Sequence, residues 1–227
     1  MASNKDFKIK HWKIVSSNDI KMMDNFLNAI KASDKEFLRL FDIFVQELAV
    51  FNEQIKVFGD QTWHRAYTRT LFSMIETLTY RLKEDIYNLL ESEGEEITSE
   101  LQGKLKGQII KRNKQGQLQI KPCYQSLPNS IEYAFAHYAC MHSIDYKIDK
   151  NSPGWQWLIN SLKIRNRITH PKETADLEIN NDELVIIQSA GKWFLETLND
   201  LYEKCAASLF DLADALERNW NAHHSNR

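Results

Sequence analysis

The strongest constraint on the fold is a long helical pattern that begins after Asp182 and covers about 35 residues. Apolar residues recur there at intervals of three or four, which places them on one face of an α-helix. Asp182 is expected to cap this helix. Because so long a helix is unusual in a globular protein, the pattern predicts either a kink near Gly191 or a dimer interface. The apolar positions are Leu184, Ile187, Ala190, Phe194, Leu198, Leu201, Cys205, Leu209, Leu212 and Leu216.

Other segments also show helical spacing, and few residues in the chain would break a helix. Only seven Gly and four Pro occur among 227 residues. A capping box, Ser33-Asp34-Lys35-Glu36, is expected to end one N-terminal helix and start another. The sequence therefore predicts a single all-α domain, residues 1–227, in which an N-terminal arm and helices (1–60) precede an up-and-down bundle. The further expected helices span residues 18–32, 33–58, 61–93, 128–146 and 153–169.

Residues 101–131 differ in character from the rest of the chain, because they contain no Asp or Glu. The segments Gln108–Arg112 and Gln117–Lys121 flank a short turn, which predicts a basic β-hairpin inserted at residues 104–121. Its cations Lys111, Arg112 and Lys114 could hold RNA phosphates. The alternative is a solvated insertion whose lysines keep the protein in solution.

Composition excludes several classes of protein. The chain carries a net charge of −2, so a nucleic-acid surface would have to come from local clustering. Its three cysteines are far apart and form no metal-ligand spacing, which argues against a zinc site and fits a reducing cytoplasm. No apolar run is long enough to span a membrane, and the N-terminus does not resemble a signal peptide. No motif marks a nucleotide, flavin or metal, so no cofactor is expected.

Candidate chemistry lies at the end of the helix expected between Ser152 and Pro171. Ser152 can cap its start, and Pro171 should stop it at or before His170. Asn166 and His170 are four residues apart, so the amide could orient the imidazole. Arg165 and His170 are five apart, about 140° around an ideal helix. They converge only if the last turn loosens or a second copy of the chain contributes.

The pattern Arg165-Asn166-x-x-x-His170 at the end of an apolar helix resembles the signature of the HEPN superfamily. The resemblance implies a small all-α bundle, here residues 61–218, and a metal-independent endoribonuclease active site completed across a homodimer. It implies that His170 acts as general base on the ribose 2′-OH or as acid on the 5′-oxygen. Arg165 would stabilise charge on the phosphoryl oxygens, and Asn166 would orient His170 or contact the phosphate.

The same resemblance extends to neighbouring residues and to biological setting. Arg167 and Lys172 would hold adjacent phosphates. HEPN folds pack a helix such as 61–93 beside the motif helix, so Arg69 or Glu76 could reach the site; the alternative is a surface ion pair. Family roles in toxin–antitoxin systems and anti-phage defence imply a cytoplasmic protein with an antitoxin or regulatory partner. Some toxin subfamilies place a modified Tyr where this chain has Lys172.

Three alternatives stay open. Arg218-Asn219-Trp220-Asn221-Ala222-His223 fits the same pattern near the C-terminus. The chain could instead be a non-catalytic dimerisation or interaction module, in which the basic side chains of the Arg165–His170 turn only contact helix-end carbonyls. It could also bind RNA through the hairpin without cutting it. A catalytic Arg165 and His170 must face a shared cleft, which makes their exposure the discriminating feature.

Overall fold

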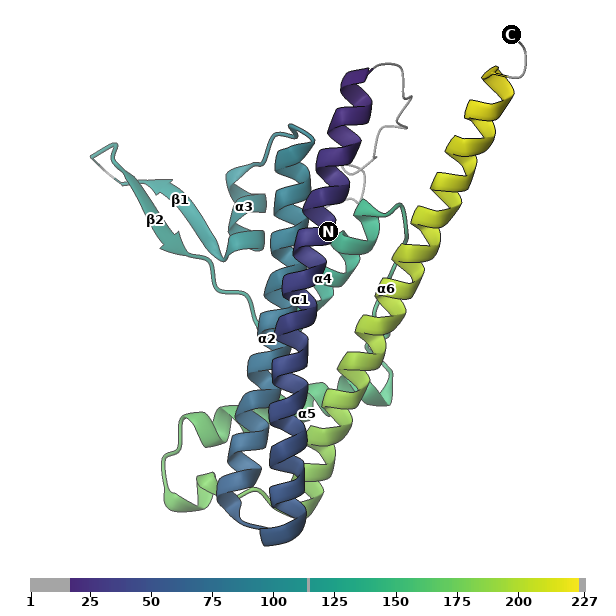
Figure 1. Ribbon diagram of the computed structural model, residues 1–227. Helices are drawn as coiled ribbons and strands as arrows, with labels where there is room; N and C mark the ends of the chain where they lie inside the picture. Colours follow the sequence, from purple (N-terminus) through teal and green to yellow (C-terminus); the bar gives the residue numbers. More distant parts are fainter. Residues whose placement is uncertain (1–16, 114, 225–227) are drawn as a thin grey trace.

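The computed structural model describes residues 17–113 and 115–224 as a largely helical protein (Figure 1). The all-α class is therefore confirmed. The arm expected for residues 1–16, and Lys114 in the hairpin turn, lie outside the described residues. The elements are α1 (Ser17–Phe58), α2 (Gln61–Ser92), α3 (Ser99–Lys106), β1 (Gln108–Arg112), β2 (Leu118–Pro122), α4 (Leu127–Met141), α5 (Pro153–Thr169), a 3-10 turn η1 (Thr174–Leu177) and α6 (Asn181–His224).

Three long helices, α1, α2 and α6, set the architecture. Helix α1 packs along α2, and α5 packs along α6 (Figure 1). Gly59, at a φ of +61°, allows the sharp reversal between α1 and α2, and the Asp60 side chain caps α2 by accepting from the Thr62 N–H at 2.6 Å. The core lies between α2, α4, α5 and α6. Its largest fully buried side chains include Phe72, Phe135, Phe194, Leu71, Met74, Ile75 and Leu78.

Several predicted helix boundaries were wrong. Residues 33–36 do not cap a new helix, because α1 continues through them. This segment has no Gly or Pro, and an interior Ser or Asp costs a helix only a fraction of a kcal/mol, about 0.5–0.7. The predicted Asp182 cap is replaced by Asn180, whose side chain accepts from the Glu183 N–H at 2.9 Å. Helix α4 ends near residue 141 rather than 146, since Ser143 adopts a φ of +61°.

Helix α3 was not predicted from the sequence. The Thr98 hydroxyl caps it by accepting from the Leu101 N–H at 3.2 Å, and Gly107 ends it in the left-handed conformation. It packs on the C-terminal end of α2 through Leu105, which joins Ile86 and Leu90 in a second small core. Eight residues were too few for helical periodicity to stand out within the basic segment.

The kink near Gly191, one of the two alternatives predicted for this long helix, is absent, because α6 runs unbroken from Asn181 to His224 (Figure 1). Gly191 instead allows α6 to pack closely against α2. A Cβ at this position would lie 2.7 Å from Leu71 Cδ1 on α2. Trp193 packs on Trp155, with edge-to-face rings whose centroids are 6.0 Å apart.

Gly154 should be the glycine least tolerant of substitution. A Cβ there would lie 1.9 Å from Trp193 Cδ1, inside a rigid indole ring that is packed into the α5–α6 contact. We expect Gly154→Ala to lower the free energy of unfolding by about 1–3 kcal/mol, as overpacked cores do. Urea unfolding followed by circular dichroism measures this loss. Gly191→Ala is the matched control, because its new methyl meets the flexible end of Leu71; an equal loss in both variants would contradict the prediction.

Candidate active site

Helix α5 begins and ends as the sequence predicted. The Ser152 hydroxyl accepts from the Trp155 N–H at 3.3 Å, and Pro153 occupies the first turn. At the other end the His170 N–H donates to the Asn166 carbonyl at 3.0 Å, while the backbone of His170 leaves the helical region with φ −125° and ψ 58°. Arg165 and Asn166 therefore lie in the last helical turn, and His170 lies just beyond it.

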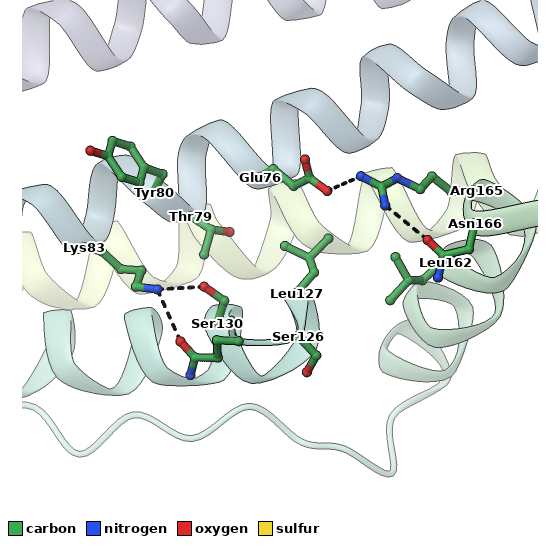
Figure 2. A pocket seen from close by; sticks show the side chains of 11 residues that line it. Glu76, Thr79, Tyr80, Lys83, Ser126, Leu127, Ser130, Leu162, Arg165 and Asn166 are labelled. Atoms are coloured by element: carbon green, nitrogen blue, oxygen red, sulfur yellow. Dashed lines mark hydrogen bonds and ion pairs between the residues drawn. The ribbon is translucent and has the colours of Figure 1, made fainter. Parts of the chain in front are cut away.

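Arg165 is held by two partners at the surface of the bundle. Its guanidinium donates to Glu76 Oε1 on α2 at 2.5 Å and to the neighbouring Asn166 Oδ1 at 3.1 Å (Figure 2). It also lies over the Phe72 ring, 5.8 Å from the centroid. The Arg165 side chain is 27% exposed and that of Glu76 is 44% exposed. Glu76 on α2 thus contacts α5 through its ion pair with Arg165.

A pocket of about 550 Å³, whose lining includes several polar side chains, opens beside this ion pair. It lies between α2, α5 and the segment that leads into α4, so residues far apart in sequence line it (Figure 2). Arg165 and Asn166 contribute the α5 side of the wall. The lining residues are Glu76, Thr79, Tyr80, Lys83, Gln125, Ser126, Leu127, Ser130, Leu162, Arg165 and Asn166.

His170 does not line this pocket. Its side chain is exposed, and within residues 17–113 and 115–224 its imidazole has no hydrogen-bond partner. The Asn166 side-chain oxygen, which was expected to serve His170 or a phosphate, accepts from Arg165 instead. A single chain therefore does not bring Arg165 and His170 to one cleft.

Arg167, predicted to hold a phosphate, is engaged within the protein. It forms a two-pronged ion pair with Glu183, at 2.8 and 2.9 Å, and donates to the Glu178 carbonyl at 2.6 Å. The pair joins the end of α5 to the start of α6. Lys172, the other predicted phosphate ligand, has an exposed side chain, while its backbone N–H donates to Asp176 Oδ2 at 2.7 Å.

Replacing Arg167 with methionine should affect stability more than RNA binding. The hydrogen bond from Arg167 lowers the pKa of Glu183 from its ordinary value of 4.5, so the pair stabilises the fold at neutral pH and is lost as Glu183 protonates at lower pH. We expect Arg167→Met to cost about 1 kcal/mol near neutral pH. The difference in the free energy of unfolding between Arg167→Met and wild type should become smaller at pH values well below 4.5. Urea unfolding of both proteins at neutral pH and at a pH well below 4.5 measures this difference. A difference that does not depend on pH would contradict the stabilising role of the ion pair.

Two arginines of α2 contact backbone carbonyls within the motif and in the segment that follows it. Arg69 donates to the Ile168 carbonyl at 3.4 Å, and Arg65 donates to the Leu177 carbonyl at 3.2 Å. In the described part of the chain neither guanidinium is within ion-pair distance of a carboxylate, so both could still bind an anion. His64 of α2 is 4% exposed, and its Nδ1 lies 3.1 Å from the Ile179 carbonyl.

The basic hairpin exists but lies away from the motif. Strands β1 and β2 pair antiparallel, with the second strand starting one residue later than predicted. The hairpin projects from the bundle beside α3, near the C-terminal end of α2, whereas α5 contacts the N-terminal half of α2 (Figure 1). Arg112 is exposed and donates to the Gly116 carbonyl at 3.0 Å, and Lys111 belongs to β1. These cations are therefore not brought together with Arg165.

Of the residues that line the pocket, the sequence indicated Glu76, Arg165 and Asn166 but not the buried cation Lys83. It is 6% exposed, and its ammonium donates to Ser130 Oγ at 3.0 Å and Gln125 Oε1 at 3.3 Å (Figure 2). Burial lowers the pKa of this ammonium. A signal was present, because Lys83 follows Glu76 by seven residues and Thr79 by four, which places all three on one face of α2.

The second Arg-Asn-x-x-x-His pattern lies in the last turns of α6, where the helix continues through His224. This end of α6 points away from α5 (Figure 1). Arg218 is exposed, and the side chain of His223 lies outside the described residues. The structure thus separates the two candidate motifs.

Among the residues that the structure describes, no three His, Cys, Asp or Glu side chains come together as a metal site would require. The helices of this part of the chain include none with the length and apolar character that a membrane crossing demands. No family model, curated protein or solved structure matches the chain.

Proposed function

We propose that the protein is a metal-independent endoribonuclease of the HEPN type, a single helical domain that cuts single-stranded or loop RNA. The observation that carries the proposal is the placement of Arg165. Glu76 and Asn166 hold its guanidinium at the wall of a pocket that is large enough for part of a nucleotide. Two hydrogen-bonded partners fix the cation before substrate arrives, which is the arrangement that electrostatic stabilisation of a transition state requires.

The proposed reaction is an internal transfer at phosphorus. His170 removes the proton from the ribose 2′-OH, and the 2′-oxygen then attacks the adjacent phosphorus. Arg165 stabilises the negative charge that develops on the phosphoryl oxygens. The bond to the 5′-oxygen breaks, and that oxygen takes up a proton from the protonated His170 or from water. The products are a 2′,3′-cyclic phosphate and a 5′-OH.

The active unit in this proposal is a homodimer. Arg165 lines a pocket and the His170 of the same chain does not, so a second copy is needed to bring an imidazole to the guanidinium. The exposed end of α5 leaves His170 accessible for such an encounter. Arg69, which reaches the Ile168 carbonyl, would then lie beside the shared site as an accessory cation.

An RNA-cleavage assay in EDTA tests the function directly. We expect cleavage of an unstructured or loop-containing RNA with cyclic-phosphate and 5′-OH ends. Substitution of 2′-deoxyribose at the cleaved position should block the reaction, because the nucleophile is then missing. Cleavage that EDTA abolishes, or that leaves a 5′-phosphate, would contradict the mechanism.

A cytoplasmic role in toxin–antitoxin or anti-phage systems follows from the same proposal. An RNA-cutting enzyme of this kind needs restraint, so an antitoxin or regulatory protein is the expected partner. Expression of the wild-type chain alone should then slow cell growth, and expression of His170→Ala should not. Equal growth with both chains would argue against this setting.

A non-catalytic dimerisation or interaction module is the second candidate. The observation that favours it is the exposed His170 outside the pocket, together with large apolar side chains exposed on α1. These include Leu38, Val50, Val57 and Phe58, which are 56–68% exposed. A protein that dimerises but cuts no RNA in the assay above would support the module. Binding of RNA without cleavage, lost when Lys111, Arg112 and Lys114 are reversed in charge, would instead assign RNA binding to the hairpin.

A further inference from the structure

The pocket beside Arg165 contains a second, buried cation that the proposed reaction does not use. Lys83 is 6% exposed, yet it lies at no ion-pair distance from any carboxylate in the described residues. Its two partners, Ser130 Oγ and Gln125 Oε1, are both neutral. A lysine ammonium has three N–H donors, so Lys83 has one N–H beyond the two that these partners accept.

The charges around the pocket do not cancel. Glu76 is the acidic residue of the lining, and it is engaged by Arg165. Lys83 therefore adds an unbalanced positive charge at the other end of the same wall. A buried ammonium is costly unless an anion or several hydrogen bonds compensate it. The chemistry of the pocket consequently favours an anionic ligand.

The start of helix α4 adds to this preference. Ser126 is the N-cap residue, but its side chain makes no hydrogen bond to the N–H groups of the first turn of α4. Pro128, in the same turn, has no N–H of its own. The first N–H groups of a helix carry partial positive charge and attract anions. Ser126 and Leu127 both line the pocket, so the positive end of a 15-residue helix borders the cavity that Lys83 enters (Figure 2).

We propose that Lys83, Ser130 and the first turn of α4 form a phosphate-binding subsite, which accepts a phosphate of the RNA strand next to the one that Arg165 contacts. This inference rests on the proposed function. Glu76 and Lys83 are seven residues apart, about 10 Å along α2 at 1.5 Å per residue. The subsite is therefore separate from the Arg165 phosphate, and the substrate must extend beyond the bond that is cut. A bound phosphate would also offset the burial that lowers the pKa of Lys83.

Binding experiments that need no cleavage test the subsite. The probes are inorganic phosphate, adenosine 5′-monophosphate and a short all-2′-deoxy oligonucleotide, which 2′-OH attack cannot cut. Lys83→Met removes the charge while keeping an unbranched side chain that suits a buried site. Ser130→Ala provides a second variant with a smaller change, and Lys192→Met is the control, since Lys192 is exposed on α6. Circular dichroism verifies that each variant is folded.

We expect Lys83→Met to weaken oligonucleotide binding about tenfold, the loss of one charged hydrogen-bond contact. The slope of log affinity against log salt should fall by about 0.7, as for one lost phosphate contact on a single strand. Ser130→Ala should show a smaller loss in the same direction, and Lys192→Met none.

The outcomes separate the sources of phosphate and the two proposals. A loss seen with adenosine 5′-monophosphate and inorganic phosphate, but not with the oligonucleotide, would keep the phosphate site and overturn its assignment to an RNA strand. Unchanged affinity for all three probes in folded Lys83→Met and Ser130→Ala would overturn the subsite. Because no probe is cleaved, a protein that fails the cleavage assay but loses oligonucleotide affinity in Lys83→Met would retain the binding subsite without the nuclease.

Discussion

Replacing His170 with alanine should abolish RNA cleavage and leave the fold intact. A general base or acid contributes about 100- to 10,000-fold to rate, so the residual activity should fall below detection in an ordinary assay. The His170 side chain is exposed and has no hydrogen-bond partner among the described residues, and substitutions at such positions change stability by no more than about 0.5 kcal/mol. Cleavage rates in EDTA, measured beside thermal melting curves, test both parts of the expectation.

His223→Ala is the matched control for this experiment. It removes the histidine of the second pattern at the far end of α6 and should leave cleavage unchanged. Loss of activity in His223→Ala alone would move the active site to that end of α6. Full activity in a folded His170→Ala protein would end the assignment of the α5 motif.

Replacing Arg165 with alanine should lower kcat by about 100- to 1,000-fold, the usual cost of removing one fixed donor that stabilises transition-state charge. Arg165→Lys should recover little of this loss. The guanidinium bonds Glu76 and Asn166 at the same time, and a lysine ammonium cannot reproduce that planar arrangement. Single-turnover kinetics at saturating RNA separates this loss of rate from weaker binding.

Glu76→Gln provides the control for Arg165. It keeps a hydrogen-bond acceptor for the guanidinium but removes the charge, so Arg165 should remain in place with a smaller loss of rate. Since both side chains are partly exposed, stability should change by no more than about 1 kcal/mol in either variant. A rate in Arg165→Ala close to that of wild type would show that Arg165 has no part in the transition state.

Much of the fold follows from local sequence, and the failures have local causes too. The ends of α5 were predictable because Ser152, Pro153 and Pro171 act through their own backbone geometry. The continuity of α1 across residues 33–36 was not, since a capping sequence is equally compatible with a helix interior when no Gly or Pro intervenes. Gly191 looked like a break but instead lets α6 approach Leu71.

The candidate site was predictable in its residue types and less so in its geometry. Helical spacing paired Asn166 with His170, but the Asn166 side chain accepts from the adjacent Arg165 instead. Packing of α2 beside α5 brought Glu76 to Arg165. The separation of His170 from Arg165 agrees with the angle of about 140° between these positions on an ideal helix, whereas the path by which the chain leaves α5 does not follow from the sequence. Helical spacing placed Lys83 on the same face of α2 as Glu76, but its burial beside Ser130 depends on how α4 packs on α2, which the sequence does not show.

The ion pair between Arg167 and Glu183 has a consequence for how the enzyme would be assembled. Together with the contacts of Arg165 to Glu76 and of Arg69 to the Ile168 carbonyl, it fastens the last turn of α5 to both α2 and α6. Unwinding that turn to bring His170 to its own Arg165 would break several of these contacts at once. Association of two folded chains would break none of them. Catalysis would then be a property of the pair of molecules, and the rate per chain would depend on how often two chains meet.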